Sequence, residues 1–155
     1  MTIFKTVGHA ALVSFFVSCA TQHFAGALPM TNIAKGAFSG ITEARQEVIR
    51  DKAAWEKLWN QHNVTTKQGG RIPEIDFAKE MVIAVTLGRK RTGGYAIEIL
   101  SVAAEDKKLK VTVKRTAPAP GAMVTQALTA PFHFVAVPRS DLNQEFVEVK
   151  AADKK

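Results

Sequence analysis

Cysteine is nearly absent from this 155-residue chain, which has one, at position 19. A single thiol cannot form an intramolecular disulfide, so packing alone must hold the fold together. The early apolar run over residues 10–17 is too short to span a bilayer. The sequence also lacks the H-E-x-x-H, G-x-S-x-G and Walker motifs. Nothing local therefore indicates a metalloprotease, a serine hydrolase or a P-loop nucleotide-binding protein.

Histidines and carboxylates are too dispersed to form a local site. His62 and His133 lie in separate segments without a partner four residues away, which is a poor metal-binding pattern. The carboxylates are scattered over alternating faces, so they provide no acid–base pair. We therefore predict no catalytic residue, no metal, no cofactor and no enzymatic activity. The alternative is an enzyme whose site is assembled from distant residues, for which His133, Asp76 and Tyr95 are the candidates.

The first residues are predicted to be a signal peptide. Lys5 supplies a weak positive region ahead of the apolar run, so we expect export. Phe16-Val17-Ser18-Cys19 resembles a bacterial lipobox, which predicts a leader over 1–18 and lipidation of Cys19. The competing site is Ala25-Gly26-Ala27, which predicts a leader over 1–27 and an unmodified mature protein beginning at Leu28.

The two cleavage sites predict different locations. A lipid on Cys19 anchors the protein to a membrane, and Ala20 provides no acidic retention signal. This favours an outer-membrane lipoprotein that faces the periplasm. Cleavage after Ala27 instead predicts a soluble periplasmic or secreted protein.

The charge balance is basic, with a formal net charge of +7. Nucleic-acid binding is not predicted, because no aromatic side chains are interleaved with the cations and exported proteins rarely meet nucleic acid. A solvated, mildly basic surface is the simpler interpretation, and attraction to an acidic partner or anionic lipid is the next.

Composition divides the remaining chain into three parts. Residues 19–38 are small and polar without periodicity, so they are predicted to be a tether. Residues 39–150 carry the periodic segments of one domain, and 151–155 form a basic tail.

The periodic segments predict one helix followed by strands. Asp51 is a candidate N-cap for a helix to about Gln61, in which Trp55, Leu58 and Trp59 form one apolar stripe. Strands are expected over 44–50, 81–87, 95–102, 109–115, 132–137 and 146–149. The predicted fold is α+β, an antiparallel β-sheet of five or six strands covered by the one early amphipathic helix. Its core should include Val82, Val85, Ile97, Ile99, Val111, Val113, Phe134 and Val137.

The connection after Leu87 is rich in glycine and cations. Paired glycines permit positive φ and close backbone approach, which is typical of a hairpin turn. The alternative is a recognition loop on a rigid sheet, with exposed backbone and with cations that favour an acidic partner. The candidate partner-binding residues are Arg89, Lys90, Arg91, Thr92, Gly93, Gly94 and Tyr95.

Several segments together resemble the PrcB C-terminal domain family over roughly residues 39–149. They are Ile75-Asp76-Phe77, the strand ending at Leu87-Gly88, the run from Gly93 to Ile99, Pro118-Ala119-Pro120-Gly121, and the run from Leu128 to His133. The resemblance implies a non-catalytic, exported lipoprotein. Such a protein is expected to be a subunit that associates with and stabilises a secreted or envelope protease.

The run Lys90-Arg91-Thr92-Gly93-Gly94-Tyr95 is also similar to the threonine-glycine-tyrosine loop of chagasin-like cysteine-protease inhibitors. The Asn-Pro pair that precedes that family's loop is replaced here by Arg89-Lys90. The second resemblance implies an inhibitor that presents this loop to a protease.

Overall fold

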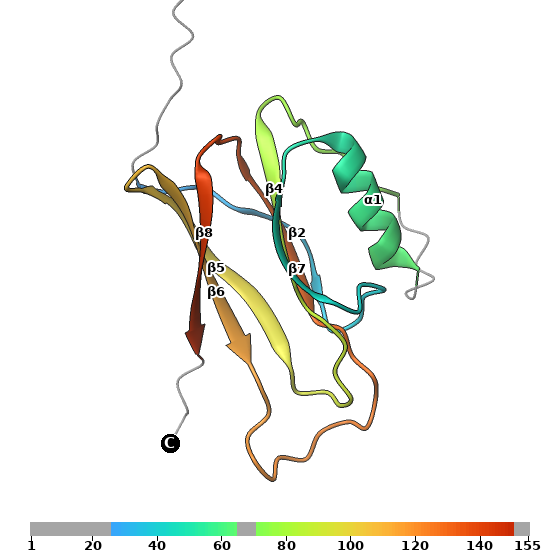
Figure 1. Cartoon of the computed structure of the whole chain (residues 1–155). Helices are drawn as coiled ribbons and strands as arrows, with labels where there is room; N and C mark the ends of the chain where they lie inside the picture. Colours follow the sequence, from blue (N-terminus) through green and yellow to red (C-terminus); the bar gives the residue numbers. More distant parts are fainter. Residues whose placement is uncertain (1–25, 65–70, 151–155) are drawn as a thin grey trace, which may run out of the picture.

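A computed structural model describes residues 26–64 and 71–150. It contains one helix and eight strands in two sheets, with sheet orders β1-β5-β6-β8 and β2-β7-β4-β3. The elements are β1 (Gly26–Ala27), β2 (Thr31–Gly36), β3 (Ala44–Ile49), α1 (Lys52–Asn63), β4 (Glu80–Leu87), β5 (Ala96–Glu105), β6 (Lys108–Thr116), β7 (Phe132–Pro138) and β8 (Asn143–Lys150). Figure 1 shows the two sheets packed together, with α1 on the outer face of the sheet that contains β4.

The central strands β4 and β7 are covered on both faces. In β4, Met81, Ile83 and Val85 face the other sheet, whereas Val82 and Ala84 lie under α1. A strand covered on both sides has no wet face, and this explains its unbroken apolar sequence. β5 and β6 instead alternate, because the outer face of their sheet meets solvent.

Helix α1 forms as predicted. The Asp51 carboxylate accepts a hydrogen bond of 2.8 Å from the Ala54 backbone amide and so caps the first turn. Trp55, Leu58 and Trp59 are buried against the sheet. All eight predicted core side chains are buried as well, but they belong to two separate apolar layers.

The prediction of a single antiparallel sheet that begins after residue 39 was wrong in three respects. There are two sheets, and β8 pairs with β6 in parallel. Residues 26–27 and 31–36 form strands although they were predicted to belong to a tether. β2 pairs along β7, and Leu28 lies in the layer between the sheets. The ordered unit therefore starts before residue 39.

Candidate partner-binding surface

The glycine-rich loop joins the two sheets. β4 belongs to one sheet and β5 to the other, so residues 88–95 are a crossing and not the hairpin turn that paired glycines suggested. Gly88 begins the crossing with φ of +71°, and a Cβ there would lie 2.9 Å from the Ala44 backbone nitrogen. Only glycine satisfies both conditions without displacing the β3 backbone.

The long connection between β6 and β7 holds the loop in place. Lys90 and Thr129 exchange two backbone hydrogen bonds of 2.7 and 3.0 Å, and the Gly93 amide donates to the Thr125 carbonyl at 2.9 Å. The Thr129 hydroxyl donates to the Thr92 carbonyl at 2.8 Å. The expectation of an exposed loop backbone is therefore wrong for this part of the loop, since these groups already have partners and Gly93 is buried.

The base of the loop is also packed. Gly94 has φ of +83° and approaches Pro118 and Val124. Tyr95 is half-buried against the layer between the sheets, and the Lys90 ammonium lies 5.5 Å from the centroid of its ring. Gly93 is thus buried and Thr92 and Tyr95 are partly buried, whereas Arg89, Arg91 and Gly94 are exposed.

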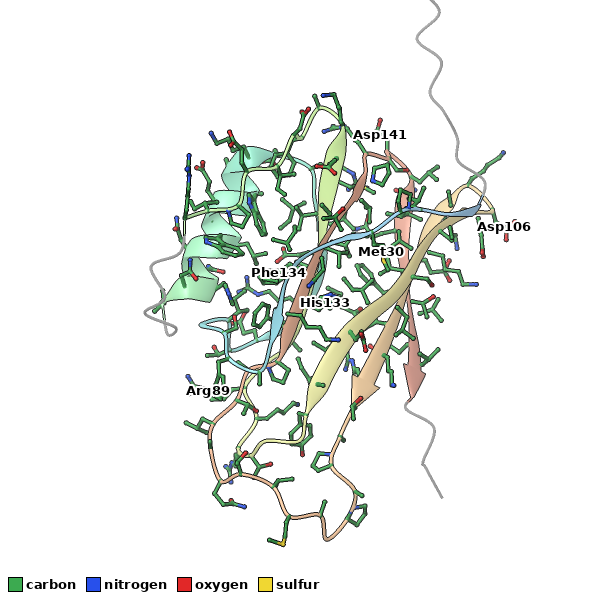
Figure 2. The ribbon with its side chains drawn as sticks, turned by 180° about the vertical axis from the view of Figure 1, so that it is seen from behind. Met30, Arg89, Asp106, His133, Phe134 and Asp141 are labelled. Carbon is green, nitrogen blue, oxygen red and sulfur yellow. The ribbon has the colours of Figure 1, made fainter. Side chains whose placement is uncertain are left out.

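Exposed apolar side chains accompany these cations at the same end of the molecule. Phe38, Met123 and Leu128 expose 58%, 102% and 63% of their surface. Residues 117–131 contain no charged side chain, so this end carries the positive charge of the glycine loop. We call Phe38, Arg89, Arg91, Met123 and Leu128 the loop-end surface; Figure 2 labels Arg89 at this end.

The residues proposed for a dispersed catalytic site have separate partners. The Asp76 carboxylate accepts from the Ala78 amide at 3.1 Å and pairs with Lys79 at 2.8 Å, which fixes the turn before β4. The hydrogen bond from Lys79 holds the pKa of Asp76 below its usual value. Tyr95 instead lies at the glycine loop, and His133 lies between the two sheets.

His133 fastens one sheet to the other. Its Nδ1 accepts a hydrogen bond of 2.9 Å from the Ile99 amide on β5, so the proton is on Nε2, which lies 3.1 Å from the Asn32 side-chain oxygen. Burial is the main cause that lowers the pKa of His133; Lys35 lowers it further and Glu98 opposes the shift. Burial also lowers the pKa of His62.

These two histidines predict a loss of stability in mild acid. The unfolded chain binds protons at a histidine pKa of about 6.5, above the folded pKa values, so the free energy of unfolding falls as pH drops below about 6.5. Each histidine adds at most about 1.4 kcal/mol per pH unit, down to its folded pKa, and nothing changes above the unfolded pKa. Urea unfolding at pH 5 and 7.5 measures the loss. Replacing both histidines by asparagine should flatten this window, and an unchanged slope in that variant would contradict the assignment.

A serine–histidine contact that sequence reasoning did not find lies at the end of α1. The Ser39 hydroxyl lies 3.0 Å from His62 Nδ1 and accepts from the Ile41 amide at 3.1 Å. Both residues are buried, and Phe132 lies 4.3 Å from the His62 ring, centroid to centroid. The contact joins residues 39–41 to the helix end, because Gly40 also donates to the His62 carbonyl at 2.8 Å. Ser39 and His62 are 23 positions apart, so no local sequence pattern could have predicted their contact.

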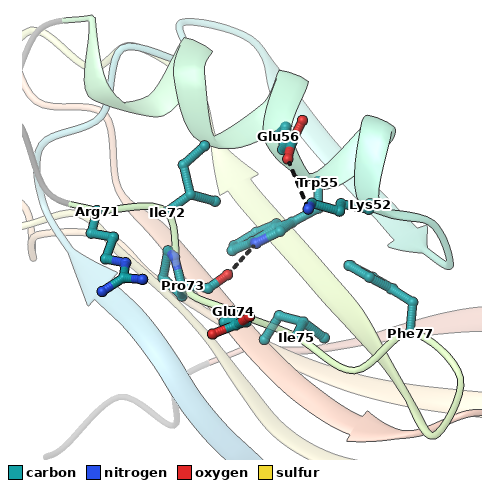
Figure 3. A pocket seen from close by; sticks show the side chains of 9 residues that line it. All are labelled: Lys52, Trp55, Glu56, Arg71, Ile72, Pro73, Glu74, Ile75 and Phe77. Atoms are coloured by element: carbon teal, nitrogen blue, oxygen red, sulfur yellow. Dashed lines mark hydrogen bonds and ion pairs between the residues drawn. The ribbon is translucent and has the colours of Figure 1, made fainter.

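A hollow lies beside α1, on the helix-covered face of the sheet (Figure 3). It has a volume of about 390 Å³, between the start of α1 and residues 71–77. The Trp55 indole nitrogen donates to the Pro73 carbonyl at 2.9 Å, and Lys52 pairs with Glu56 at 3.8 Å. Its charged lining contains both signs, so it has no net preference for an anion or a cation.

Within the described ranges, no cluster of three or more potential metal-ligating side chains occurs. No helix there is long and apolar enough to cross a membrane. Cys19, Ala25 of the alternative cleavage site and the tail over 151–155 lie outside the described residues, whereas Gly26 and Ala27 of that cleavage site form β1.

The geometry defines a β-rich α+β domain with a rigid, cationic and apolar loop end. Comparison with known families gives the particular similarity: residues 81–138, from β4 to the end of β7, match the family model described as PrcB C-terminal. The match includes the glycine loop and the long connection, and it is shorter than the 39–149 stretch predicted from the sequence. No curated protein and no solved structure matches the chain.

Proposed function

We propose that this protein is a non-catalytic, exported binding module whose loop-end surface contacts a partner protein. The family match supports this as a PrcB-like protein. The partner in this proposal is a secreted or envelope protease, which the module stabilises. One observation carries the proposal. Exposed cations and the exposed apolar side chains of Phe38, Met123 and Leu128 lie at the same end of the molecule, on loops that are joined by backbone hydrogen bonds. Large apolar side chains that a fold leaves exposed commonly mark interaction sites.

The site of attachment also supports the proposal. Gly26 pairs with Ala104, close to the Asp106 turn, whereas the paired residues Ala96 and Thr116 lie next to the loops. Asp106 and Arg89 lie at opposite ends of the molecule in Figure 2. The ten residues of β5 separate the ends by about 30 Å. A lipid on Cys19, which we propose as the anchor to the outer membrane, would hold the end that carries Gly26. The loop-end surface then faces away from that membrane, toward the periplasm.

Changing Arg89, Lys90 and Arg91 together to alanine should weaken partner association roughly ten-fold, and more at low salt. Folding should change little, because Arg89 and Arg91 are exposed and the Lys90 hydrogen bonds use its backbone. The measurement is recovery of envelope proteins by the tagged wild type and variant.

The matched control replaces Lys52, Lys57 and Lys110 by alanine, which removes the same charge away from the loops. Equal partner recovery by the wild type and the loop variant would overturn the proposal for this surface. Equal losses of partner recovery in the loop variant and the control variant would mean that only the net charge matters. That result would also overturn the proposal.

A further inference from the structure

A small notch lies within the loop-end surface, where three segments of the chain meet. Its volume is about 120 Å³, and its walls come from residues 38–42, from Arg89, and from residues 128–130. This space is several times what one water molecule needs, so the notch can take one aliphatic side chain.

The walls of the notch are held by backbone hydrogen bonds. The Ala130 amide donates to the Ala37 carbonyl at 2.8 Å, and the Arg89 amide donates to the Thr42 carbonyl at 3.0 Å. A third bond of 2.7 Å joins Lys90 to Thr129. The backbone around the notch is therefore held in place before any ligand arrives, which reduces the ordering cost of binding.

The lining combines apolar surface with one unpaired cation. Phe38 and Leu128 are apolar and more than half exposed. The Arg89 guanidinium forms no hydrogen bond or ion pair with the part of the chain that the structure describes. The nearby Glu43 carboxylate is already paired with Arg45 at 2.7 Å. An arginine fork that lacks a partner binds a carboxylate with two parallel hydrogen bonds.

We infer that the notch binds the C-terminal residue of a partner chain, with its aliphatic side chain between Phe38 and Leu128 and its α-carboxylate on Arg89. A C-terminal residue carries both groups on one carbon, which suits a notch in which the apolar walls and the guanidinium share so small a volume. An acidic side chain on a neighbouring residue would place its carboxylate further from the aliphatic group. This inference rests on the proposed function, because it names the part of a partner that the loop-end surface recognises.

The test uses NMR titration of the whole domain with the peptide Gly-Ser-Gly-Ala-Ala-Leu bearing a free carboxylate. The same peptide with a C-terminal amide should bind about ten-fold more weakly or worse, since it loses a charge-assisted contact. A third peptide ends in Leu-Glu with a C-terminal amide. It tests whether the carboxylate of an acidic side chain can replace the α-carboxylate of a chain terminus. Equal binding of acid and amide, tighter binding of the Leu-Glu peptide, or no saturable shift at millimolar peptide each overturns the inference.

Matched variants locate the site. R89Q and L128S should each lower the affinity for the free-acid peptide about ten-fold or more. R71Q and L100S should leave that binding unchanged, because these exposed side chains lie outside the loop-end surface and do not line the notch. Equal effects of R89Q and R71Q would overturn the assignment. If the peptide fails to bind but the triple loop variant still loses its envelope partner, the notch fails and the proposed function stands. If the peptide binds but partner recovery is unchanged in that variant, the proposed function fails instead.

Discussion

Replacing Trp59 by alanine should lower the free energy of unfolding by about 3–5 kcal/mol. The side chain is 8% exposed, and its ring lies 5.2 Å from the Trp55 ring and 5.3 Å from the His62 ring, centroid to centroid. Removing it leaves a cavity between α1 and the sheet, because the neighbouring aromatic rings cannot collapse fully into the space. Urea unfolding followed by circular dichroism measures the loss, and an unchanged midpoint would refute the helix-on-sheet packing.

Phenylalanine substitutions separate packing from hydrogen bonding at the two tryptophans. Trp59 Nε1 is buried without a hydrogen-bond partner in the described part of the chain, whereas Trp55 Nε1 donates to Pro73. Trp59→Phe removes an unpaired polar group, so it should cost less than Trp55→Phe, which leaves the Pro73 carbonyl without its donor. The opposite order would mean that the Trp59 indole has a partner in solution.

Changing Gly94 to valine should cost about 2–5 kcal/mol, the sum of a backbone penalty and an overpacking penalty. The residue has φ of +83°, which is unfavourable for a side chain with a branched Cβ. A Cβ there would also lie 3.0 Å from Pro118 Cβ and from Val124 Cγ1, so the long connection would have to move. Thermal unfolding of the variant measures the combined effect.

Gly121 provides the matched control for this change. Its φ is +79°, but a Cβ added there would meet nothing within 4 Å. Gly121→Val should therefore show the backbone penalty alone, about 1–2 kcal/mol. Equal losses at the two positions would mean that the contact between the glycine loop and the long connection contributes nothing to stability.

Several parts of the structure could be predicted from the sequence because their causes are local. Asp51 and the spacing of Trp55, Leu58 and Trp59 predicted α1 and its buried face, since a cap and a 3.6-residue period act within a few turns. The unbroken apolar run from Met81 predicted a buried strand. The paired glycines correctly indicated positive φ at Gly94.

The candidate surface depended on contacts that no local pattern encodes. The glycine loop lies against a connection more than 30 positions away, and Arg89 lies next to Phe38 and Leu128 only because three segments converge. Neither Phe38 nor Leu128 carries a signal of its own, since isolated apolar residues in loops are common. The loop was therefore predicted as a site, but its buried groups and its apolar neighbours were not.

By itself the sequence determined the type and approximate bounds of the helix and of six strands, because hydrophobic periodicity reports which side chains are buried. Only the tertiary structure decided which strands pair. A strand buried on both faces has the same apolar sequence pattern whether a helix or a second sheet covers each face. The division into two sheets could therefore not be deduced from the sequence. The same holds for β2, whose small and polar residues form a strand because β7 offers an edge with which they can hydrogen-bond. Pairing depends on the partner's edge, and a partner 100 residues away leaves no trace in the local sequence.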